Sequence, residues 1–352
     1  MTKDIDAVVI GAGAAGAAAA VKLNQSGIDS ILLIDRDSRT GGILNQCIHS
    51  GFGLSYYKKE LSGPEYAHYL DKTLEQSGVK KVYNSTVLDI KVKTGTSGNT
   101  YQLTISSGDF PLKEVTTRVI ILATGSFERT RENISVPGTR PAGVFTAGAA
   151  QRFINIEGIR IGHRVVIQGS GDIGLIMARR LSIEGYKVVR VLERLPYLSG
   201  LLRNKIQCLD DFGIPLSLEK EIIEITGQSR VKGVWSGDSA GRGEHREFIP
   251  CDTVLFAVGL IPEAELLKET DIPGLLGRGG IPIANNRFES PLHGIFTAGN
   301  ALHINDLADS ASIEGEKAAV AVIEYLTNQN DYNKTCKNGP PYKEIERPQF
   351  TS

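Results

Sequence analysis

The sequence has no excess of charge of either sign and no long apolar run, and both absences narrow its class. Its 352 residues carry 39 Lys and Arg against 40 Asp and Glu, a formal net charge of −1. This balance gives no electrostatic attraction to nucleic acid or to an anionic membrane, so neither is expected as a partner. No stretch approaches the roughly 18 apolar residues typical of a membrane-spanning helix, so no membrane insertion is expected.

Cysteine is also scarce, and the few cysteines present are widely scattered. They give neither a zinc-binding spacing nor a Cys-x-x-Cys pair, so no metal site is predicted: Cys47, Cys208, Cys251 and Cys336. The opening residues, MTKDIDAVVIGAG, place acids and glycines where a signal peptide needs a basic start and an unbroken apolar stretch. We therefore expect a cytoplasmic protein with reduced thiols.

Glycine, by contrast, is abundant, with 39 residues, and its first cluster has a recognisable order. An apolar strand, AVVI, leads into Gly11, Gly13 and Gly16 in the pattern G-x-G-x-x-G, and a second strand, ILLID, ends at Asp35. In such a pattern the first glycine allows a tight turn, the second lets a pyrophosphate approach, and the third lets the helix pack on the sheet. Asp35 would accept hydrogen bonds from an adenosine ribose. The pattern predicts a dinucleotide site.

The same arrangement recurs in the second half of the chain. Gly169, Gly171 and Gly174 repeat the glycine pattern, and Glu193 follows Gly169 at the same spacing as Asp35 follows Gly11. Each copy continues into short alternating strands and then a strand that ends in glycine, VIILATG or TVLFAVG. We predict an α/β fold of two Rossmann-like dinucleotide-binding domains, each with a small β-meander.

This order of motifs, closed by GIFTAGN, resembles that of the pyridine nucleotide-disulfide oxidoreductase superfamily over roughly residues 4–328. The resemblance implies that the first copy binds FAD and the second NAD(P)H. It also implies a discontinuous FAD-binding domain, a hinged NAD(P)-binding domain and a C-terminal tail: residues 1–126 with 260–330, residues 127–259, and residues 331–352. A helix over about residues 310–326 would point its positive N-terminus at the flavin ring, and Glu128 and Arg129 are expected on the hinge.

The resemblance carries the predicted cofactor contacts onto this sequence. For FAD they are Gly11, Gly13, Ala14, Ala15, Gly16, Asp35, Arg36, Gly41, Gly42, Gln46, Cys47, Val87, Ala123, Thr124, Gly125, Gly299, Asn300 and Ser312. For NAD they are Gly169, Gly171, Asp172, Ile173, Gly174, Glu193, Val258 and Gly259. One departure is Asn300, because the superfamily has aspartate there. Asparagine can hydrogen-bond a ribityl hydroxyl, but it is not a carboxylate.

Glu193 bears on the choice between NADH and NADPH. A carboxylate at this strand end accepts hydrogen bonds from the ribose hydroxyls and repels a 2′-phosphate, which favours NADH. The neighbouring Arg194 argues in the other direction, and the alternative interpretation of Glu193 is a surface acid.

Several segments resemble a narrower subgroup, among them GGILNQCIHSGFG, ATGSFERTR and GNALHINDLADSASIEGE. This subgroup holds oxidoreductases associated with anaerobic glycerol-3-phosphate dehydrogenase and subunits of proline, hydroxyproline and opine dehydrogenases. The resemblance implies hydride transfer between NADH and FAD, with electrons passed to a partner dehydrogenase subunit or a small acceptor. Two alternatives stay open: a self-contained NADH oxidase or peroxidase that uses Cys47, and an electron-transfer subunit inactive alone. A homo-oligomer also stays open.

The segment GGILNQCIHSGFG raises the question of disulfide chemistry. Related disulfide reductases carry a second cysteine before the one at Cys47, where this sequence has Ile43 or Leu44. Other relatives use a Cys-x-x-Cys in the NAD domain or a C-terminal interface domain, and the sequence shows neither. We therefore expect no disulfide reduction, which needs an attacking and a resolving thiol.

Three candidate catalytic residues follow from the motifs. Cys47 is interpreted as a packing residue against the flavin, a thiolate that tunes it, or a peroxidatic cysteine. His49 would lower the pKa of Cys47 if the two were close, and otherwise makes structural hydrogen bonds. His303, with Asp306 nearby, would contact a substrate or partner beside the flavin, or would belong to a loop that caps the following helix.

Overall fold

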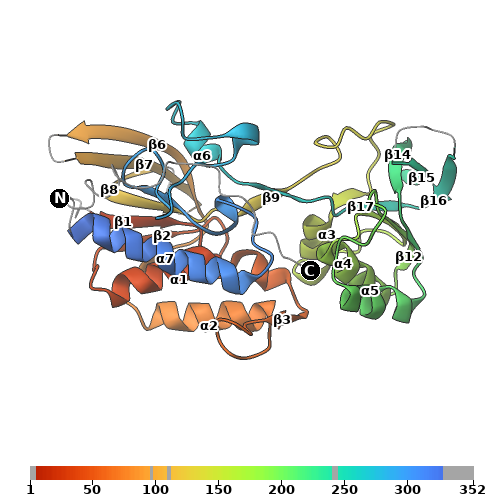
Figure 1. Ribbon diagram of the computed structural model, residues 1–352, viewed down its shortest axis with the longest axis horizontal. Coiled ribbons are helices and arrows are strands. Elements are labelled where there is room, and N and C mark those ends of the chain that lie inside the picture. Colours follow the sequence, from red (N-terminus) through yellow and green to blue (C-terminus); the bar gives the residue numbers. More distant parts are fainter. Residues whose placement is uncertain (1–4, 96–97, 109–111, 240–244, 328–352) are drawn as a thin grey trace. The chain divides into compact units, whose positions relative to one another are not determined.

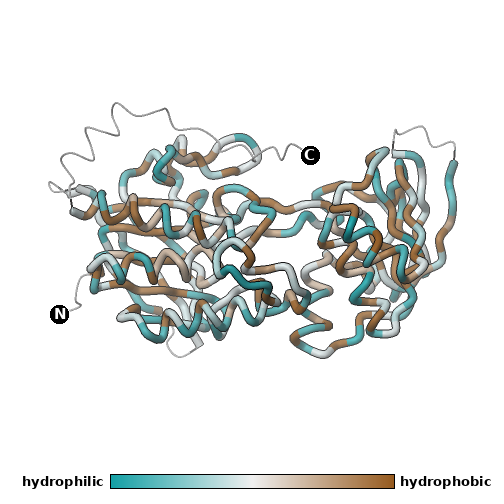
Figure 2. The backbone as a smooth tube through the Cα atoms, turned by 60° about the horizontal axis from the view of Figure 1, so that its bottom comes forward, coloured by the Kyte–Doolittle hydropathy of each residue, from teal (hydrophilic) through white to brown (hydrophobic). Residues whose placement is uncertain are grey.

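The computed structural model describes residues 5–95, 98–108, 112–239 and 245–327, and the chain divides into two compact units (Figure 1). Unit 1 comprises Met1–Phe127 and Ile261–Ser352, and unit 2 comprises Glu128–Leu260. The expected C-terminal tail, residues 331–352, lies outside the described residues, as does Cys336. Hydrophobic stretches run through both units beside hydrophilic ones, as each unit needs for its own core (Figure 2).

Unit 1 is built on one mixed sheet (Figure 1). Its spatial order is β5 (Lys80–Val82), β2 (Ile31–Ile34), β1 (Ile5–Ile10), β8 (Lys113–Leu122), β7 (Gly98–Ser107) and β6 (Ser85–Gly95), with β19 (Ile295–Thr297) also paired to β8. Strands β5, β2, β1, β8 and β19 pair in parallel, whereas β6, β7 and β8 form an antiparallel meander. The predicted meander therefore merges with the parallel sheet through β8.

Helices and meander cover opposite faces of the parallel strands in unit 1. Ala7 and Val9 of β1 pack with α1 (Ala14–Gln25), α2 (Gly63–Glu75) and α7 (Ala308–Thr327). Val8 and Ile10 pack instead with meander residues and with Leu267 of α6 (Glu265–Lys268). Side chains alternate between faces along a strand, so the continuous apolar run AVVI of β1 is buried on both.

Unit 2 repeats this arrangement with a fully parallel sheet. Its order is β10 (Val144–Thr146), β17 (Thr253–Phe256), β11 (Arg164–Gln168), β12 (Lys187–Leu192) and β13 (Leu216–Ser217). One face packs on α3 (Ala147–Asn155), α4 (Asp172–Ile183) and α5 (Leu202–Cys208), and the other on a separate meander of β14 (Lys220–Gly227), β15 (Val231–Asp238) and β16 (Glu247–Pro250). The predicted α/β fold of two Rossmann-like units is confirmed.

Short elements complete the described chain. The strands among them are β3 (Ser50–Phe52) with β4 (Leu61–Ser62), and β9 (Ser126–Glu128) with β18 (Leu260–Pro262). The 3₁₀ turns are η1 (Gly42–Gln46), η2 (Asp210–Phe212), η3 (Arg278–Gly280) and η4 (Gly299–Ala301). Turns η1 and η4 matter most for function, because they carry predicted flavin contacts.

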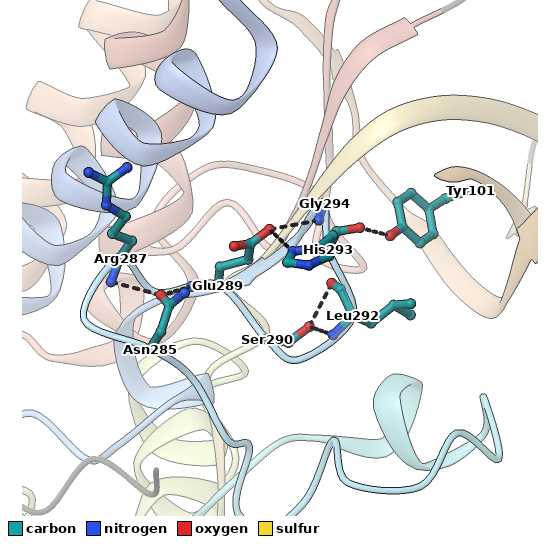
Figure 3. Close-up of polar contacts among 8 residues, drawn as sticks. All are labelled: Tyr101, Asn285, Arg287, Glu289, Ser290, Leu292, His293 and Gly294. Atoms are coloured by element: carbon teal, nitrogen blue, oxygen red, sulfur yellow. Dashed lines mark hydrogen bonds and ion pairs between the residues drawn. The ribbon is translucent and has the colours of Figure 1, made fainter. Parts of the chain in front are cut away.

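The loop before β19 is fastened by a buried carboxylate (Figure 3). Glu289 is fully buried, accepts the Gly294 N–H at 3.1 Å, and lies 3.3 Å from Nδ1 of His293. Asn285 Oδ1 accepts two backbone N–H groups of the same loop, at 2.8 and 3.1 Å, and the Tyr101 hydroxyl donates to the His293 carbonyl. These bonds fix the entry to β19, and so place the glycine turn that follows this strand.

Candidate dinucleotide sites

The three glycines of the first pattern have three different surroundings. Gly11 has φ +104°, and a Cβ there would lie 2.2 Å from the carbonyl oxygen of Ala123. A Cβ on Gly16 would lie 1.8 Å from the carbonyl oxygen of Gly11. A Cβ on Gly13 would meet no atom within 4 Å. Gly11 and Gly16 are thus required by turn and packing, whereas Gly13 borders open space at the start of α1.

The second pattern reproduces these surroundings in unit 2. Gly169 has φ +107°, and a Cβ there would lie 2.1 Å from the carbonyl oxygen of Ala257. A Cβ on Gly174 would lie 2.3 Å from the carbonyl oxygen of Gly169, and one on Gly171 would meet no atom within 4 Å. Both units therefore keep a free approach at the second glycine, in front of a helix N-terminus whose N–H groups suit a phosphate. The geometry fits a dinucleotide in each unit.

Asp35 lies directly behind the first glycine turn. Its carboxylate accepts the N–H groups of Ala12 at 2.5 Å and Asp37 at 2.7 Å. Burial raises the pKa of Asp35, and these two bonds partly oppose the shift. Each carboxylate oxygen has a further acceptor position, so a ribose hydroxyl can still bind. Arg36 instead pairs with Glu263 at 3.2 Å, a partner that no sequence motif indicated.

Glu193 is buried and held by four donors, so it is not the surface acid considered as an alternative. It accepts the N–H of Ser170 at 2.9 Å, the hydroxyl of Ser170 at 2.7 Å, the hydroxyl of Ser199 at 2.9 Å and the N–H of Leu195 at 2.9 Å. Burial raises the pKa of Glu193, but the hydrogen bonds outweigh it and the net pKa is lowered. Oε2 accepts three of these bonds and Oε1 accepts only the Leu195 N–H. Oε1 therefore keeps an acceptor position for a ribose hydroxyl, whereas a ribose hydroxyl at Oε2 would replace a serine hydroxyl.

The remaining predicted NAD contacts surround this turn. Asp172 begins α4, and its Oδ1 accepts the Leu201 N–H at 2.9 Å and Asn204 Nδ2–H at 2.7 Å. Ile173 and Val258 are half-buried, and Gly259 is exposed with φ +104°. Asp172 thus fastens the loop that follows Glu193 rather than pointing a bare carboxylate at a phosphate.

The segment Gly41–Cys47 runs against the first glycine turn. Gly41 donates its N–H to the Ala12 carbonyl at 2.8 Å, and a Cβ on Gly42 would lie 3.3 Å from the Cα of Gly13. Gln46 and Cys47 are both buried in this segment. The predicted contact segment therefore borders the open side of Gly13.

Cys47, the last residue of this segment, is buried. Its carbonyl accepts the Gly63 N–H at 2.9 Å, and a Cβ on Gly63 would lie 2.9 Å from the Cβ of Cys47. Burial raises the pKa of the Cys47 thiol to about 12. The nearby His49 places Nδ1 at 2.9 Å from the Ser50 carbonyl, and its ring centroid lies 5.0 Å from that of Phe52. These contacts favour the packing interpretation of Cys47 and the structural interpretation of His49.

Three strands end together at one edge of the unit 1 sheet. Ile10 of β1 and Thr297 of β19 both pair with Leu122 of β8. The segments that follow these strand ends are therefore neighbours, at the edge where parallel α/β sheets bind ligands. Gly299 packs so close to α1 that a Cβ on it would lie 2.7 Å from the Cβ of Ala15.

The other predicted FAD contacts at this edge make internal bonds. Asn300 Oδ1 accepts the Asn305 N–H at 2.9 Å. The Ser312 hydroxyl accepts from Tyr66 at 2.8 Å and donates to the Ala14 carbonyl at 3.2 Å, so its proton is used within the protein and one acceptor position remains. Val87 and Ala123 are buried, Gly125 has φ +84°, and Thr124 donates to the Glu263 carbonyl at 2.8 Å.

His303 is paired with Glu314, which lies in the segment GNALHINDLADSASIEGE but is not among the predicted site residues. Nε2 of His303 lies 2.9 Å from Oε1 of Glu314, and the two side chains are 9% and 13% exposed. Oε2 of Glu314 accepts the Gly299 N–H at 2.9 Å and Asn305 Nδ2–H at 3.1 Å. Asp306, the other candidate in this loop, is exposed. The structure therefore joins His303 to the glycine turn through one carboxylate.

Two polar atoms, one at the end of β19 and one in the loop after it, lack a protein partner. Among the described residues, Thr297 Oγ1 and His303 Nδ1 are buried side-chain atoms with no hydrogen-bond partner. Buried polar atoms in folded proteins are nearly always satisfied. Their position beside the Gly299 turn fits a polar ligand such as the flavin nucleotide.

Glu128 and Arg129 begin unit 2, directly after unit 1 ends at Phe127, and both also make local contacts. Glu128 accepts the N–H groups of Gly148 at 2.7 Å and Ala149 at 3.1 Å, and so caps the N-terminus of α3. The backbone N–H of Arg129 donates to the Gly259 carbonyl at 2.9 Å.

In the part of the chain that the structure describes, no group of three His, Cys, Asp or Glu side chains could hold a metal, and no helix is long and apolar enough to cross a membrane.

Comparisons with known proteins give a matching family and several relatives of this chain. The pyridine nucleotide-disulphide oxidoreductase family matches residues 5–315. An opine oxidase subunit of Agrobacterium tumefaciens (strain Ach5) is 27% identical, with 91% of this chain and 66% of the relative covered. Hydrogen cyanide synthase subunit HcnB of Pseudomonas protegens is 25% identical, with 91% and 70% covered. The chain thus spans about two thirds of the length of these relatives.

A solved structure has the same architecture over nearly its whole length. The thioredoxin reductase of T. acidophilum superimposes with a TM-score of 0.73 at 25% identity, covering 91% of this chain and 97% of that one. The two-unit arrangement that the glycine patterns predicted is therefore shared with that reductase.

Proposed function

Because the chain belongs to the pyridine nucleotide-disulphide oxidoreductase family, we propose that it moves hydride between NADH and FAD and passes the electrons to a partner dehydrogenase subunit or a small acceptor. An FAD-dependent oxidoreductase activity follows from the family. The observation that carries the fuller proposal is the repeated open approach at Gly13 and Gly171, each in front of a helix N-terminus. Two such sites in one chain suit an enzyme that uses two dinucleotides.

Unit 1 is the proposed FAD site, and its residues hold and orient the cofactor. FAD bound there supplies the hydride-accepting chemistry, while the protein supplies position and electrostatics. The N–H groups behind Gly13 would receive the pyrophosphate, Asp35 an adenosine hydroxyl, and Asn300 a ribityl hydroxyl. Helix α7 adds a positive end for the negative charge of a reduced flavin.

Unit 2 is the proposed NADH site. Gly171 leaves the approach for the pyrophosphate, and Glu193 stands at the end of β12 as a charged carboxylate whose pKa is lowered. A 2′-phosphate would bring nearly two further negative charges beside it, which disfavours NADPH. Ribose hydroxyls can replace the hydroxyls of Ser170 and Ser199, because both pairs are neutral donors of the same kind.

The cysteines argue against disulfide reduction. Attack on a disulfide needs a thiolate at working pH. Burial raises the pKa of Cys47 and Cys251 to about 12 and also raises that of Cys208. None of these three described thiols is therefore an activated nucleophile. The same argument weakens the alternative of an oxidase or peroxidase that works through Cys47.

The acceptor is proposed from the relatives. The opine oxidase subunit and hydrogen cyanide synthase subunit HcnB carry names that make them parts of larger enzymes. A partner subunit that delivers or takes electrons is therefore proposed here too. A subunit that is idle without this partner is the second candidate, and these two names favour it as well.

Anaerobic titration of the purified chain tests the proposal. The protein is loaded with FAD, and its visible flavin absorbance is followed during addition of NADH and then, in a separate sample, of NADPH. We expect flavin bleaching by NADH at lower concentration than by NADPH. Protein that stays colourless with excess FAD would contradict the FAD site, and flavin that neither nucleotide bleaches would favour the idle-subunit alternative.

A further inference from the structure

The imidazole of His303 is fixed in one orientation by its contact with Glu314. Nε2 lies 2.9 Å from Oε1 of that carboxylate, which can only accept. Nε2 therefore carries a proton and donates it. The other ring nitrogen, Nδ1, is buried and has no protein partner. A buried ring nitrogen without a hydrogen-bond partner costs folding free energy, so we look for a ligand atom as its partner.

Glu314 ties this imidazole to the glycine turn as well. Its second oxygen accepts the Gly299 N–H at 2.9 Å and the side-chain amide of Asn305 at 3.1 Å. The His303 backbone N–H also donates to the Gly299 carbonyl, at 3.3 Å. The Glu314 carboxylate thus holds the His303 imidazole and the Gly299 turn together, and a shift of this carboxylate would move both.

The position of His303 and the Gly299 turn indicates which ligand they would contact. Gly299 packs on Ala15 in the first turn of α1, two residues beyond the open approach at Gly13. The strand that leads to Gly299, β19, ends in register with β8, and β1 ends at the same level on the other side of β8. A molecule that occupies the first dinucleotide site reaches this edge, and a flavin nucleotide offers hydroxyl, N–H and carbonyl groups along its length.

We propose that Nδ1 of His303 makes a hydrogen bond to the bound flavin nucleotide, and that Glu314 is the positioning residue that aims it there. The inference rests on the proposed FAD site in unit 1. Nδ1 accepts from a flavin hydroxyl or N–H when the imidazole is neutral, and donates to a flavin oxygen or nitrogen when it is doubly protonated. In either state the carboxylate keeps Nε2 occupied, so Nδ1 is the nitrogen that faces the cofactor.

Two substitutions of His303 distinguish the role of Nδ1 from that of Nε2. In His303→Asn the amide occupies the place of Nδ1 and loses the contact with Glu314. In His303→Gln the amide reaches toward Glu314 and loses the group at Nδ1. FAD affinity of the apo-protein, the visible flavin spectrum and the flavin midpoint potential are measured for each. We expect His303→Gln to weaken FAD binding by about five- to tenfold and to change spectrum and potential, and His303→Asn to bind FAD more tightly than His303→Gln.

A third variant tests the positioning role. Glu314→Gln places an amide against the N–H donors of Gly299 and Asn305, so we expect the imidazole to lose its fixed orientation and the flavin spectrum and potential to move as in His303→Gln. Glu316→Gln is the matched control on the same helix, since the Glu316 carboxylate accepts from Tyr56 at 2.5 Å instead. We expect wild-type flavin spectrum and potential for it.

The outcomes separate this inference from the proposed function. Wild-type protein that binds no FAD would overturn the proposed FAD site itself. Wild-type protein that binds FAD, with His303→Gln unchanged in affinity, spectrum and potential, would overturn the inference alone. The reverse order of the two His303 variants would overturn it too. If His303→Gln does not fold, as judged by circular dichroism, Glu314→Gln against Glu316→Gln decides by spectrum and potential.

Discussion

Gly16 packs so closely on Gly11 that a Cβ on Gly16 would lie 1.8 Å from the Gly11 carbonyl oxygen. The corresponding pair in unit 2, Gly174 and Gly169, shows the same relationship at 2.3 Å. Between the two members of each pair lies a further glycine, Gly13 or Gly171, where a Cβ would meet no atom within 4 Å. The pattern G-x-G-x-x-G therefore combines two glycines that the packing requires with one that the packing does not require.

Alanine at these positions should separate folding from binding. Gly16→Ala forces a Cβ into a backbone carbonyl, so we expect a loss of unfolding free energy of about 3 kcal/mol or more, at the upper end of overpacking effects. Gly13→Ala has ordinary helical-cap backbone angles and open space, so we expect wild-type stability within about 0.5 kcal/mol and weaker FAD binding. Chemical denaturation and FAD titration measure the two effects.

Gly171→Ala supplies the control in the other unit. Its Cβ also enters open space, so it should leave FAD binding unchanged and weaken only the nucleotide in unit 2. Equal loss of FAD affinity in Gly13→Ala and Gly171→Ala would contradict the assignment of one site to each unit.

The choice of nucleotide should depend on the charge of Glu193. In Glu193→Gln the amide loses the charge and faces the N–H donors of Ser170 and Leu195. We expect the preference for NADH over NADPH to fall about tenfold, because repulsion of the 2′-phosphate is gone, with a loss of stability of about 1–3 kcal/mol from the mismatched buried donors. Flavin bleaching by each nucleotide gives the preference.

Ser199→Ala is the matched control for that variant. It removes one hydroxyl donor to the carboxylate but keeps the charge. Its NADH preference should be that of the wild type. A wild-type preference in Glu193→Gln would show that another group selects the nucleotide.

Local sequence was sufficient for the fold and the glycine turns. A strand, a glycine pattern and a helix follow one another within about 30 residues, so their geometry is decided by neighbours in the chain. The acids at the strand ends, Asp35 and Glu193, could be placed for the same reason. The meander of unit 1 was also foreseen, but not its fusion with the parallel sheet through β8, which depends on the length of one strand.

Contacts between distant segments could not be foreseen. Glu314 meets His303 and Gly299 only because α7 begins where it does, and the spacing along the chain follows no motif. The hydroxyls of Ser170 and Ser199 converge on Glu193 through the fold of a loop. Glu128 caps α3 across 20 positions. Such side chains become visible only when the elements are packed.

Cys47 should behave as an unreactive thiol. Its pKa is raised to about 12 by burial, so the thiolate fraction stays small across the range in which exposed cysteines ionise. We expect native protein to react with iodoacetamide at Cys47 far more slowly than unfolded protein does, with little acceleration between about pH 7 and pH 9. Peptide mass spectrometry after timed labelling identifies the site.

Cys47→Ser should accordingly keep NADH-dependent flavin reduction within about twofold of the wild type, since a small polar residue replaces a packing one. Loss of turnover with oxygen or peroxide in this variant, with FAD still bound, would favour the peroxidase alternative.

His293 should link stability to pH through Glu289. The hydrogen bond from His293 to the buried Glu289 carboxylate raises the pKa of His293 above its usual value of 6.5, against a smaller opposing effect of burial. A histidine with a raised folded-state pKa stabilises the fold fully below the unfolded-state value, and this contribution is lost as pH rises through the folded-state pKa. The unfolding midpoint temperature should therefore fall as the pH rises above about 6.5. His293→Gln should reduce that fall, whereas His68→Gln on α2 should keep it. An equal fall in all three proteins would place the linkage elsewhere.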